Sequence, residues 1–331
     1  MKIAICPADV AGCGYYRSWL PFTALARADG HELKVVDTPE DPVFFGTDLA
    51  VTQRISTPIL LGWIGSFRQN RPGKRLIMDI DDNLRQLPSS NPAASVYGNQ
   101  KIGTLNFEKA AREVDMLTVS NQELANVYAD LNKEILICPN ALDDELFHEF
   151  SKKAPTTEEV RKDGEFRIGY AGTATHVADF ATVVKPLCAF MRKHPEAKLV
   201  LFGQDLRPLF HPEFWGRIEH VHGIAPNEQM VRRPSEAKDI FMRVYYEVLV
   251  KLQLDVAIAP LERYTFNKGK SYLKILEYGL AGVPAIATKF GPYAEYAHGH
   301  KSAVMVASEP REWVQALEHL LDGKNRKHLA D

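Results

Sequence analysis

The sequence carries almost no excess charge of either sign, because its 331 residues have a formal net charge of −2. It therefore has no broad basic field, which argues against general binding to nucleic acid or to an anionic membrane. The four cysteines (Cys6, Cys13, Cys138 and Cys188) lack the paired short spacings of zinc sites and favour reduced thiols in a cytoplasmic protein. The sequence turns polar at Asp9, so no secretory leader is expected, and no apolar run reaches the length of a membrane span.

What the sequence does contain is a repeated alternation of short apolar runs and amphipathic segments. With 45% hydrophobic and 25% charged residues, the composition is typical of a soluble globular protein. The alternation predicts an α/β fold of two facing Rossmann-like, doubly wound domains with a cleft between them. We expect an acceptor-side domain at residues 1–150, a charged linker at 151–163, a second domain at 164–322 and a tail at 323–331.

Residues 266–284 lie between two unbroken apolar runs, so they are predicted to contain the helix of a strand-helix-strand unit. Ser271 is the predicted N-cap of this helix, and Gly282 with Pro284 beyond it marks the end.

Lys270, Lys274 and Glu277 follow one another at spacings of four and three residues, which places them on one stripe of that helix. Lysines near a helix N-terminus oppose the positive end of its dipole, so their position indicates a bound anion. A phosphate or diphosphate would suit the two ammonium groups, and Glu277 could accept hydrogen bonds from sugar hydroxyls. The alternative is a solvated face on which Lys274 and Glu277 pair with each other.

A glycine-containing loop follows the first predicted strand and includes Gly12 and Gly14. Such a loop between strand and helix lets the backbone approach a phosphate or sugar closely, although a plain tight turn remains the alternative. The loop lacks the third glycine of the dinucleotide fingerprint. Arg17, in the following helix, is a candidate donor contact.

Acidic residues stand at the end of the strand that begins at Arg75: Asp79, Asp81 and Asp82. Ligand crevices open at such strand ends, so these residues are candidates for the edge of the cleft. No further carboxylate or histidine cluster accompanies them, and we therefore expect no metal site.

A basic cluster lies around the Pro-Gly turn that precedes this strand. It is either an anion patch on the acceptor side or a solvated loop. Its members are Arg68, Arg71, Lys74 and Arg75. Residues 205–235 are aromatic and rich in proline, and their pattern does not indicate an element.

Five segments share their order and spacing with motifs of a known enzyme family: Thr118–Asn121, Cys138–Asp143, Gly169–His176, Leu254–Leu261 and Phe266–Pro284. Together they resemble the retaining glycosyltransferases of family four, which have the two-domain GT-B fold. The resemblance covers most of the chain and is densest in its second half.

The resemblance implies roles for the residues around the predicted helix. Glu277 matches the second glutamate of the family's donor-binding helix, which holds the ribose hydroxyls of a nucleotide-sugar. The first glutamate of that helix would fall at Gly269, which has no side chain. Lys270, Lys274 and the amides near Ser271 are therefore expected to carry more of the diphosphate binding.

Two glycine-containing loops are also implied in donor binding. Gly12 and Gly14 match the loop that lines the donor from the first domain. Gly172, Thr173 and His176 stand where the family usually has an arginine and a lysine, and His176 is expected either to contact the donor or to cap the following helix.

The family likeness implies a hexosyl- or pentosyltransferase that uses a UDP- or GDP-type donor, without a metal or other cofactor. Lysines and the helix dipole would stabilise the departing diphosphate, and transfer would retain the anomeric configuration. The acceptor stays open among glycans, lipid-linked sugars, proteins and hydroxylated DNA bases. The alternatives are a catalytically degenerate nucleotide-sugar binding protein and a sugar-nucleotide epimerase of the same fold.

Overall fold

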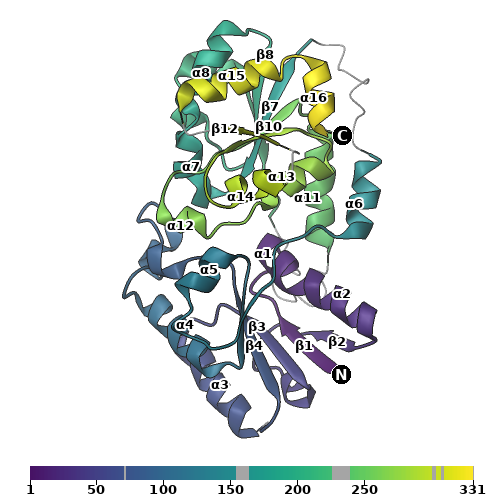
Figure 1. The fold of residues 1–331 in the computed structure, drawn as a ribbon, viewed down its shortest axis with the longest axis vertical. Coiled ribbons are helices and arrows are strands. Elements are labelled where there is room, and N and C mark those ends of the chain that lie inside the picture. Colours follow the sequence, from purple (N-terminus) through teal and green to yellow (C-terminus); the bar gives the residue numbers. More distant parts are fainter. Residues whose placement is uncertain (71, 154–163, 226–238, 300–302, 307–308, 331) are drawn as a thin grey trace.

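Two six-stranded sheets, one above the other in Figure 1, form the frame of the molecule, and every strand pairing in them is parallel. The computed structural model describes residues 1–70, 72–153, 164–225, 239–299, 303–306 and 309–330. Each sheet is covered by helices on both faces (Figure 1), so the predicted α/β class with two doubly wound domains is confirmed.

The first sheet has the strand order β2-β1-β3-β4-β5-β6. Its strands are β1 (Lys2–Cys6), β2 (Glu32–Val35), β3 (Leu49–Gln53), β4 (Arg75–Ile80), β5 (Met116–Val119) and β6 (Ile135–Ile137). Its helices are α1 (Gly12–Gly14), the π-helical turn η1 (Tyr15–Trp19), α2 (Leu20–Asp29), α3 (Pro58–Asn70), α4 (Ile102–Glu113) and α5 (Gln122–Val127). Short 3-10 turns stand at Pro42–Gly46, Leu84–Gln86 and Pro92–Ser95.

The second sheet has the order β12-β11-β10-β7-β8-β9, which is the doubly wound Rossmann arrangement. Its strands are β7 (Phe166–Gly172), β8 (Ala197–Gly203), β9 (Ile218–His222), β10 (Val256–Ala259), β11 (Ala285–Thr288) and β12 (Ala303–Val306). Its helices are α7 (Val177–Ala181), α8 (Val184–Lys193), α11 (Ile240–Lys251), α12 (Thr265–Lys268), α13 (Leu273–Leu280), α14 (Pro292–Gly299) and α15 (Pro310–His319). Short 3-10 turns stand at Ala174–His176, Arg207–Leu209 and Pro212–Arg217.

The central strands of the second sheet appear in the sequence as unbroken apolar runs. All residues of β10 and β11 are buried, as expected for parallel strands with helices on both faces. An apolar cluster also lies between the domains, where Tyr16 of η1 packs with Tyr246 and Met242 of α11 and Leu280 of α13. This cluster joins the first glycine loop to the helix that carries the predicted site.

Two further segments lie near the expected domain boundaries. Helix α6 (Asp144–Ser151) ends at the first residue of the predicted linker. Asp143 caps its start by accepting hydrogen bonds from the amides of Glu145 and Leu146. Most of the predicted linker, residues 154–163, lies outside the described residues. The predicted tail contains α16 (Gly323–Ala330), and Leu329 packs against the apolar core of the second domain.

Among the described helices, none combines the length and the apolar character of a transmembrane span.

Candidate functional site

A cavity of about 490 Å³ opens between the two sheets, at the carboxyl ends of strands from both domains. Its first-domain wall comes from the loops after β1, β4 and β6, and its second-domain wall comes from the loop after β7 and from the α12–α13 region. In the second sheet, β7 and β10 are neighbours. From β7 the chain continues to β8 on one side of the sheet, and from β10 it continues to β11 on the other side. Such a topological switch point is where α/β sheets bind ligands.

The cavity brings together Lys270, Lys274 and Glu277, as the helical spacing predicted. The segment that carries them differs from the prediction because it is two helices, α12 and α13, and not one. Tyr272 precedes α13, and Ser271 is not its N-cap; the Ser271 hydroxyl instead accepts a hydrogen bond from Asn140 Nδ2 at 3.1 Å. Lys270 thus lies before the helix, in a loop that contacts the first domain.

Lys270 bridges the two domains. Its Nζ lies 2.6 Å from Asp82 Oδ1, and the ammonium lies 4.5 Å from the centre of the Phe266 ring. The Asp82 carboxylate outweighs burial and raises the Lys270 pKa. Lys270 is therefore a fixed cation at the cavity wall.

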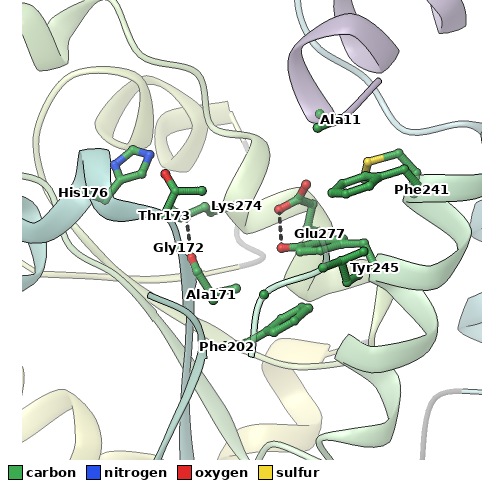
Figure 2. A pocket seen from close by; sticks show the side chains of 15 residues that line it. Ala11, Ala171, Gly172, Thr173, His176, Phe202, Phe241, Tyr245, Lys274 and Glu277 are labelled. Carbon is green, nitrogen blue, oxygen red and sulfur yellow. Dashed lines mark hydrogen bonds between the residues drawn. The ribbon is translucent and has the colours of Figure 1, made fainter. Parts of the chain in front are cut away.

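Lys274 reaches from the first turn of α13 to the end of β7, where its Nζ donates to the Ala171 carbonyl at 2.5 Å (Figure 2). The ammonium also lies 5.3 Å from the centre of the Tyr170 ring. Burial lowers the Lys274 pKa, while nearby Glu277 opposes that shift. An anion in the cavity would compensate this charge more fully than one carbonyl does.

Glu277 is buried, with 7% of its surface exposed, so the solvated-face alternative is wrong for this residue. Its two oxygens accept hydrogen bonds from the hydroxyls of Tyr16 at 3.0 Å and Tyr245 at 3.1 Å. Figure 2 shows Tyr245 and Glu277 side by side at the pocket wall. Burial raises the Glu277 pKa, and Lys274 and the two tyrosines oppose that shift.

The tyrosines that hold Glu277 were not predicted from the sequence. Tyr16 comes from the first domain, and its hydroxyl also makes a short contact with the Tyr246 hydroxyl on α11. Tyr245 stacks on Phe202 at the end of β8, with ring centres 5.3 Å apart. The only signal was the adjacency of Tyr16 to the glycine loop, because the contacts themselves depend on how the domains dock.

In the glycine loop, Gly12 lines the cavity and Gly14 does not. A Cβ on Gly14 would lie 1.8 Å from the Asp9 carbonyl oxygen, so glycine is required there for close packing of the backbone. Arg17 reaches the wall, but its nitrogens are engaged by Asp79, by the Asn140 side chain at 2.9 Å and by the Cys138 carbonyl. Arg17 is therefore a buried part of the cavity wall whose guanidinium is already held by first-domain groups.

The loop after β7 brings Gly172, Thr173 and His176 to the pockets, and Figure 2 shows the three in succession. The His176 side chain does not cap α7; its Nδ1 pairs with Asp179 Oδ2 at 2.9 Å. Burial lowers the His176 pKa. Asp179 also accepts from Asn267 Nδ2 at 2.7 Å and so connects His176 to the α12 segment.

Of the three aspartates at the carboxyl end of β4, two line the cavity. Asp81 and Asp82 belong to its wall, whereas Asp79 is buried behind them against Arg17 and Thr118. Burial, together with Asp82, raises the Asp81 pKa to about 6. Among the described residues, no group of three or more metal-ligating side chains is present.

The raised pKa of Asp81 gives a pH-dependent expectation. Because the folded-state pKa exceeds the ordinary value, the stability associated with protonated Asp81 is present at low pH and is lost as the pH rises through about 6. Asp81→Asn should therefore raise the melting temperature by about 3 °C at pH 7.5 and by much less at pH 4. Thermal unfolding at both pH values tests this, and an equal shift at both would contradict it.

The described members of the basic cluster are paired with acids of the first domain. Arg68 pairs with Asp115 at 2.9 Å and Lys74 with Asp48 at 2.5 Å, while Arg75 lies 3.7 Å from Glu134. Arg71 lies outside the described residues. None of the three described members lines the cavity, which supports the solvated alternative over an acceptor patch at this cavity.

Gly269 has a structural reason to lack a side chain. A Cβ there would lie 2.8 Å from Leu124 Cδ2, a buried side chain of α5 in the first domain. The Asn121 side chain, at the start of the same helix, donates to the Gly269 and Lys270 carbonyls at 2.9 Å each. The first domain thus occupies the space in which the family resemblance would place a glutamate.

Gly269→Glu should consequently destabilise the folded protein by about 1–3 kcal/mol, because the new side chain overpacks this contact. Leu124→Ala in the same chain should recover part of that loss, although it is destabilising by itself. Urea unfolding of the two single variants and the double variant measures the coupling. Strictly additive effects would show that Leu124 is not what excludes the side chain.

A second, more apolar cavity of about 240 Å³ adjoins the first. Phe202, Gly203, Gly223 and Ile224 line it at the ends of β8 and β9, and Tyr245 lines it from α11. The residues that line both cavities are Ala11, Gly12, Thr173, His176, Lys274 and Glu277. Together they form a site with an apolar end and a charged end.

No protein-family model matches the sequence, and neither does any curated protein. Solved structures of glycosyltransferases do match the fold. HepE from Anabaena, in complex with UDP and glucose, is 13% identical in sequence, with a TM-score of 0.58. The match covers 100% of this chain and 94% of the HepE chain. Trehalose-6-phosphate synthase OtsA is 10% identical, with a TM-score of 0.59, and the match covers 99% of this chain and 93% of the OtsA chain.

TarM from S. aureus, in complex with fondaparinux, alpha-GlcNAc-glycerol and UDP, has 10% identity and a TM-score of 0.54. The match covers 85% of this chain but only 50% of TarM, so this chain spans half of that protein. The three similarities show that the chain has the GT-B fold.

Proposed function

We propose that this GT-B protein transfers a hexosyl or pentosyl group from a nucleotide-diphosphate donor to an acceptor hydroxyl, with retention of configuration and without a metal. The observation that carries the proposal is the convergence of Lys270, Lys274 and Glu277 in one cavity between the two domains. The solved GT-B structures bound to UDP support a nucleotide-sugar as the donor class.

The proposed donor extends across both cavities. Its base would occupy the apolar end, where Phe202 and Ile224 offer flat and aliphatic surface, and its diphosphate would lie near Lys270 and Lys274. Glu277 lies where the two cavities meet, and its carboxylate can accept more than the two tyrosine hydrogen bonds. Ribose hydroxyls are therefore its proposed additional partners.

In the proposed reaction, the bond between the anomeric carbon and the diphosphate oxygen breaks, and the acceptor oxygen bonds to the same face of that carbon. The acceptor proton passes to the departing diphosphate, so the step needs no further reactant. Negative charge grows on the diphosphate as the sugar becomes oxocarbenium-like. Lys270 and Lys274 are positioned to stabilise that charge, which is the reason we propose transfer without a metal.

The direct test is the release of free nucleoside diphosphate from UDP- and GDP-sugars, with and without pooled glycan, lipid-linked and protein acceptors. A transferase releases diphosphate when its acceptor is present, and we expect this release to persist in EDTA. An epimerase would convert the donor without acceptor. Loss of release in EDTA would contradict the metal-free scheme.

A catalytically degenerate binding protein is the second candidate. The observation that favours it is Gly269, where the space for a donor-binding carboxylate is filled by Leu124. Such a protein would bind the nucleotide-sugar without releasing diphosphate under any acceptor. We propose a cytoplasmic location for either activity, where nucleotide-sugars are made.

A further inference from the structure

The Lys270–Asp82 ion pair crosses the cleft at the place proposed for the diphosphate. Both side chains line the cavity of about 490 Å³, and they are partly accessible, with 20% of Lys270 and 26% of Asp82 exposed. A partly solvated pair of this kind can exchange partners, because water lowers the free energy of separating its members. Lys270, the cation proposed to bind the donor diphosphate, is thus already paired with the Asp82 carboxylate.

Lys270 does not need Asp82 to stay in place. Its ammonium lies over the Phe266 ring, and its backbone carbonyl accepts from Asn121 of the first domain at 2.9 Å. The next residue, Ser271, is held separately by Asn140. The Lys270 loop would therefore remain docked on the first domain if the Asp82 charge were removed.

Asp82 is likewise fixed by its backbone and not by its side chain. Its carbonyl accepts hydrogen bonds from the Tyr128 hydroxyl at 2.7 Å and from the Leu84 amide at 3.1 Å. These contacts anchor the loop after β4 to the first-domain core. The carboxylate can turn away from Lys270 without disturbing them.

We infer that Asp82 is an internal competitor for Lys270, which the diphosphate of the donor displaces when it binds. The inference rests on the proposed function, because it takes the diphosphate as the incoming anion. Donor binding is then an exchange of one anion for another at Lys270. Asp82 lines the first-domain wall of the same cavity together with Asp81, so the displaced carboxylate would remain at that wall.

Calorimetric titration of the full chain with pyrophosphate, UDP, GDP and uridine tests the inference. Asp82→Asn should bind pyrophosphate and the preferred nucleoside diphosphate roughly fivefold to tenfold more tightly than wild type, since Lys270 is released. Uridine carries no phosphate and should bind both proteins equally. In a Lys270→Ala background the gain from Asp82→Asn should be smaller.

Asp115→Asn is the matched control, because Asp115 forms a partly buried pair with Arg68 in the same domain, away from the cavity. It should leave all four affinities unchanged. If Asp82 only held the domains together, Asp82→Asn would weaken UDP and uridine alike, and that result would overturn the inference. Equal diphosphate affinity in Asp82→Asn and wild type would also overturn it, whereas absence of any diphosphate binding in wild type would overturn the proposed function as well.

Discussion

Replacing Lys274 by methionine is expected to reduce donor turnover by about 10²–10³-fold, because one preorganised charge on the departing diphosphate is lost. The melting temperature should stay within about 2 °C of wild type. Burial lowers the Lys274 pKa, so the buried ammonium carries a desolvation cost that methionine removes. This gain in stability offsets the lost hydrogen bond to the Ala171 carbonyl. Turnover assays and thermal unfolding of the same preparation measure the two effects.

Lys251→Met is the control for this prediction, because Lys251 lies on α11 with 71% of its side chain exposed. It should change neither turnover nor stability. Wild-type turnover in Lys274→Met would remove Lys274 from the site, and loss of the folded state would show that its role is structural.

Glu277→Gln is expected to lower kcat/KM by about 10–100-fold, mainly through weaker donor binding, because an amide replaces a carboxylate as acceptor. In wild type, the carboxylate form is lost as the pH falls through a pKa that burial has raised. The acid limb of the wild-type pH profile should therefore lie above the usual range of glutamate, and it should disappear in Glu277→Gln. Steady-state kinetics of wild type and Glu277→Gln, measured over a range of pH, test both expectations.

Glu247→Gln serves as its matched control, since Glu247 lies on the surface of α11 and pairs with exposed Lys251. This variant should keep the wild-type profile. An acid limb that persists unchanged in Glu277→Gln would assign that titration to another group.

The sequence was sufficient for the frame of the molecule because its signals are local. The unbroken apolar runs of β10 and β11 follow directly from burial on both faces of a parallel sheet. Lys270, Lys274 and Glu277 could be predicted to lie at one site because residues three and four apart share one side of a helix. Lys270 itself lies just before α13.

The remaining features depend on contacts between distant parts of the chain. Tyr16 reaches Glu277 across 261 positions, and Asp82 reaches Lys270 across 188, so no periodic pattern could reveal either pair. Ser271 looked like an N-cap by type, but its hydroxyl is engaged by Asn140 from the other domain. Domain docking, and not local propensity, decides these positions.

In the proposed function, the interdomain cavity binds the diphosphate of a nucleotide-sugar through Lys274. Calorimetric titration of wild type and Lys274→Met with UDP and GDP tests it most directly. We expect one of these nucleotides to bind wild type at one site per chain and to bind Lys274→Met at least about tenfold more weakly. Binding of equal strength to both proteins, or no binding of either nucleotide to wild type, would contradict it.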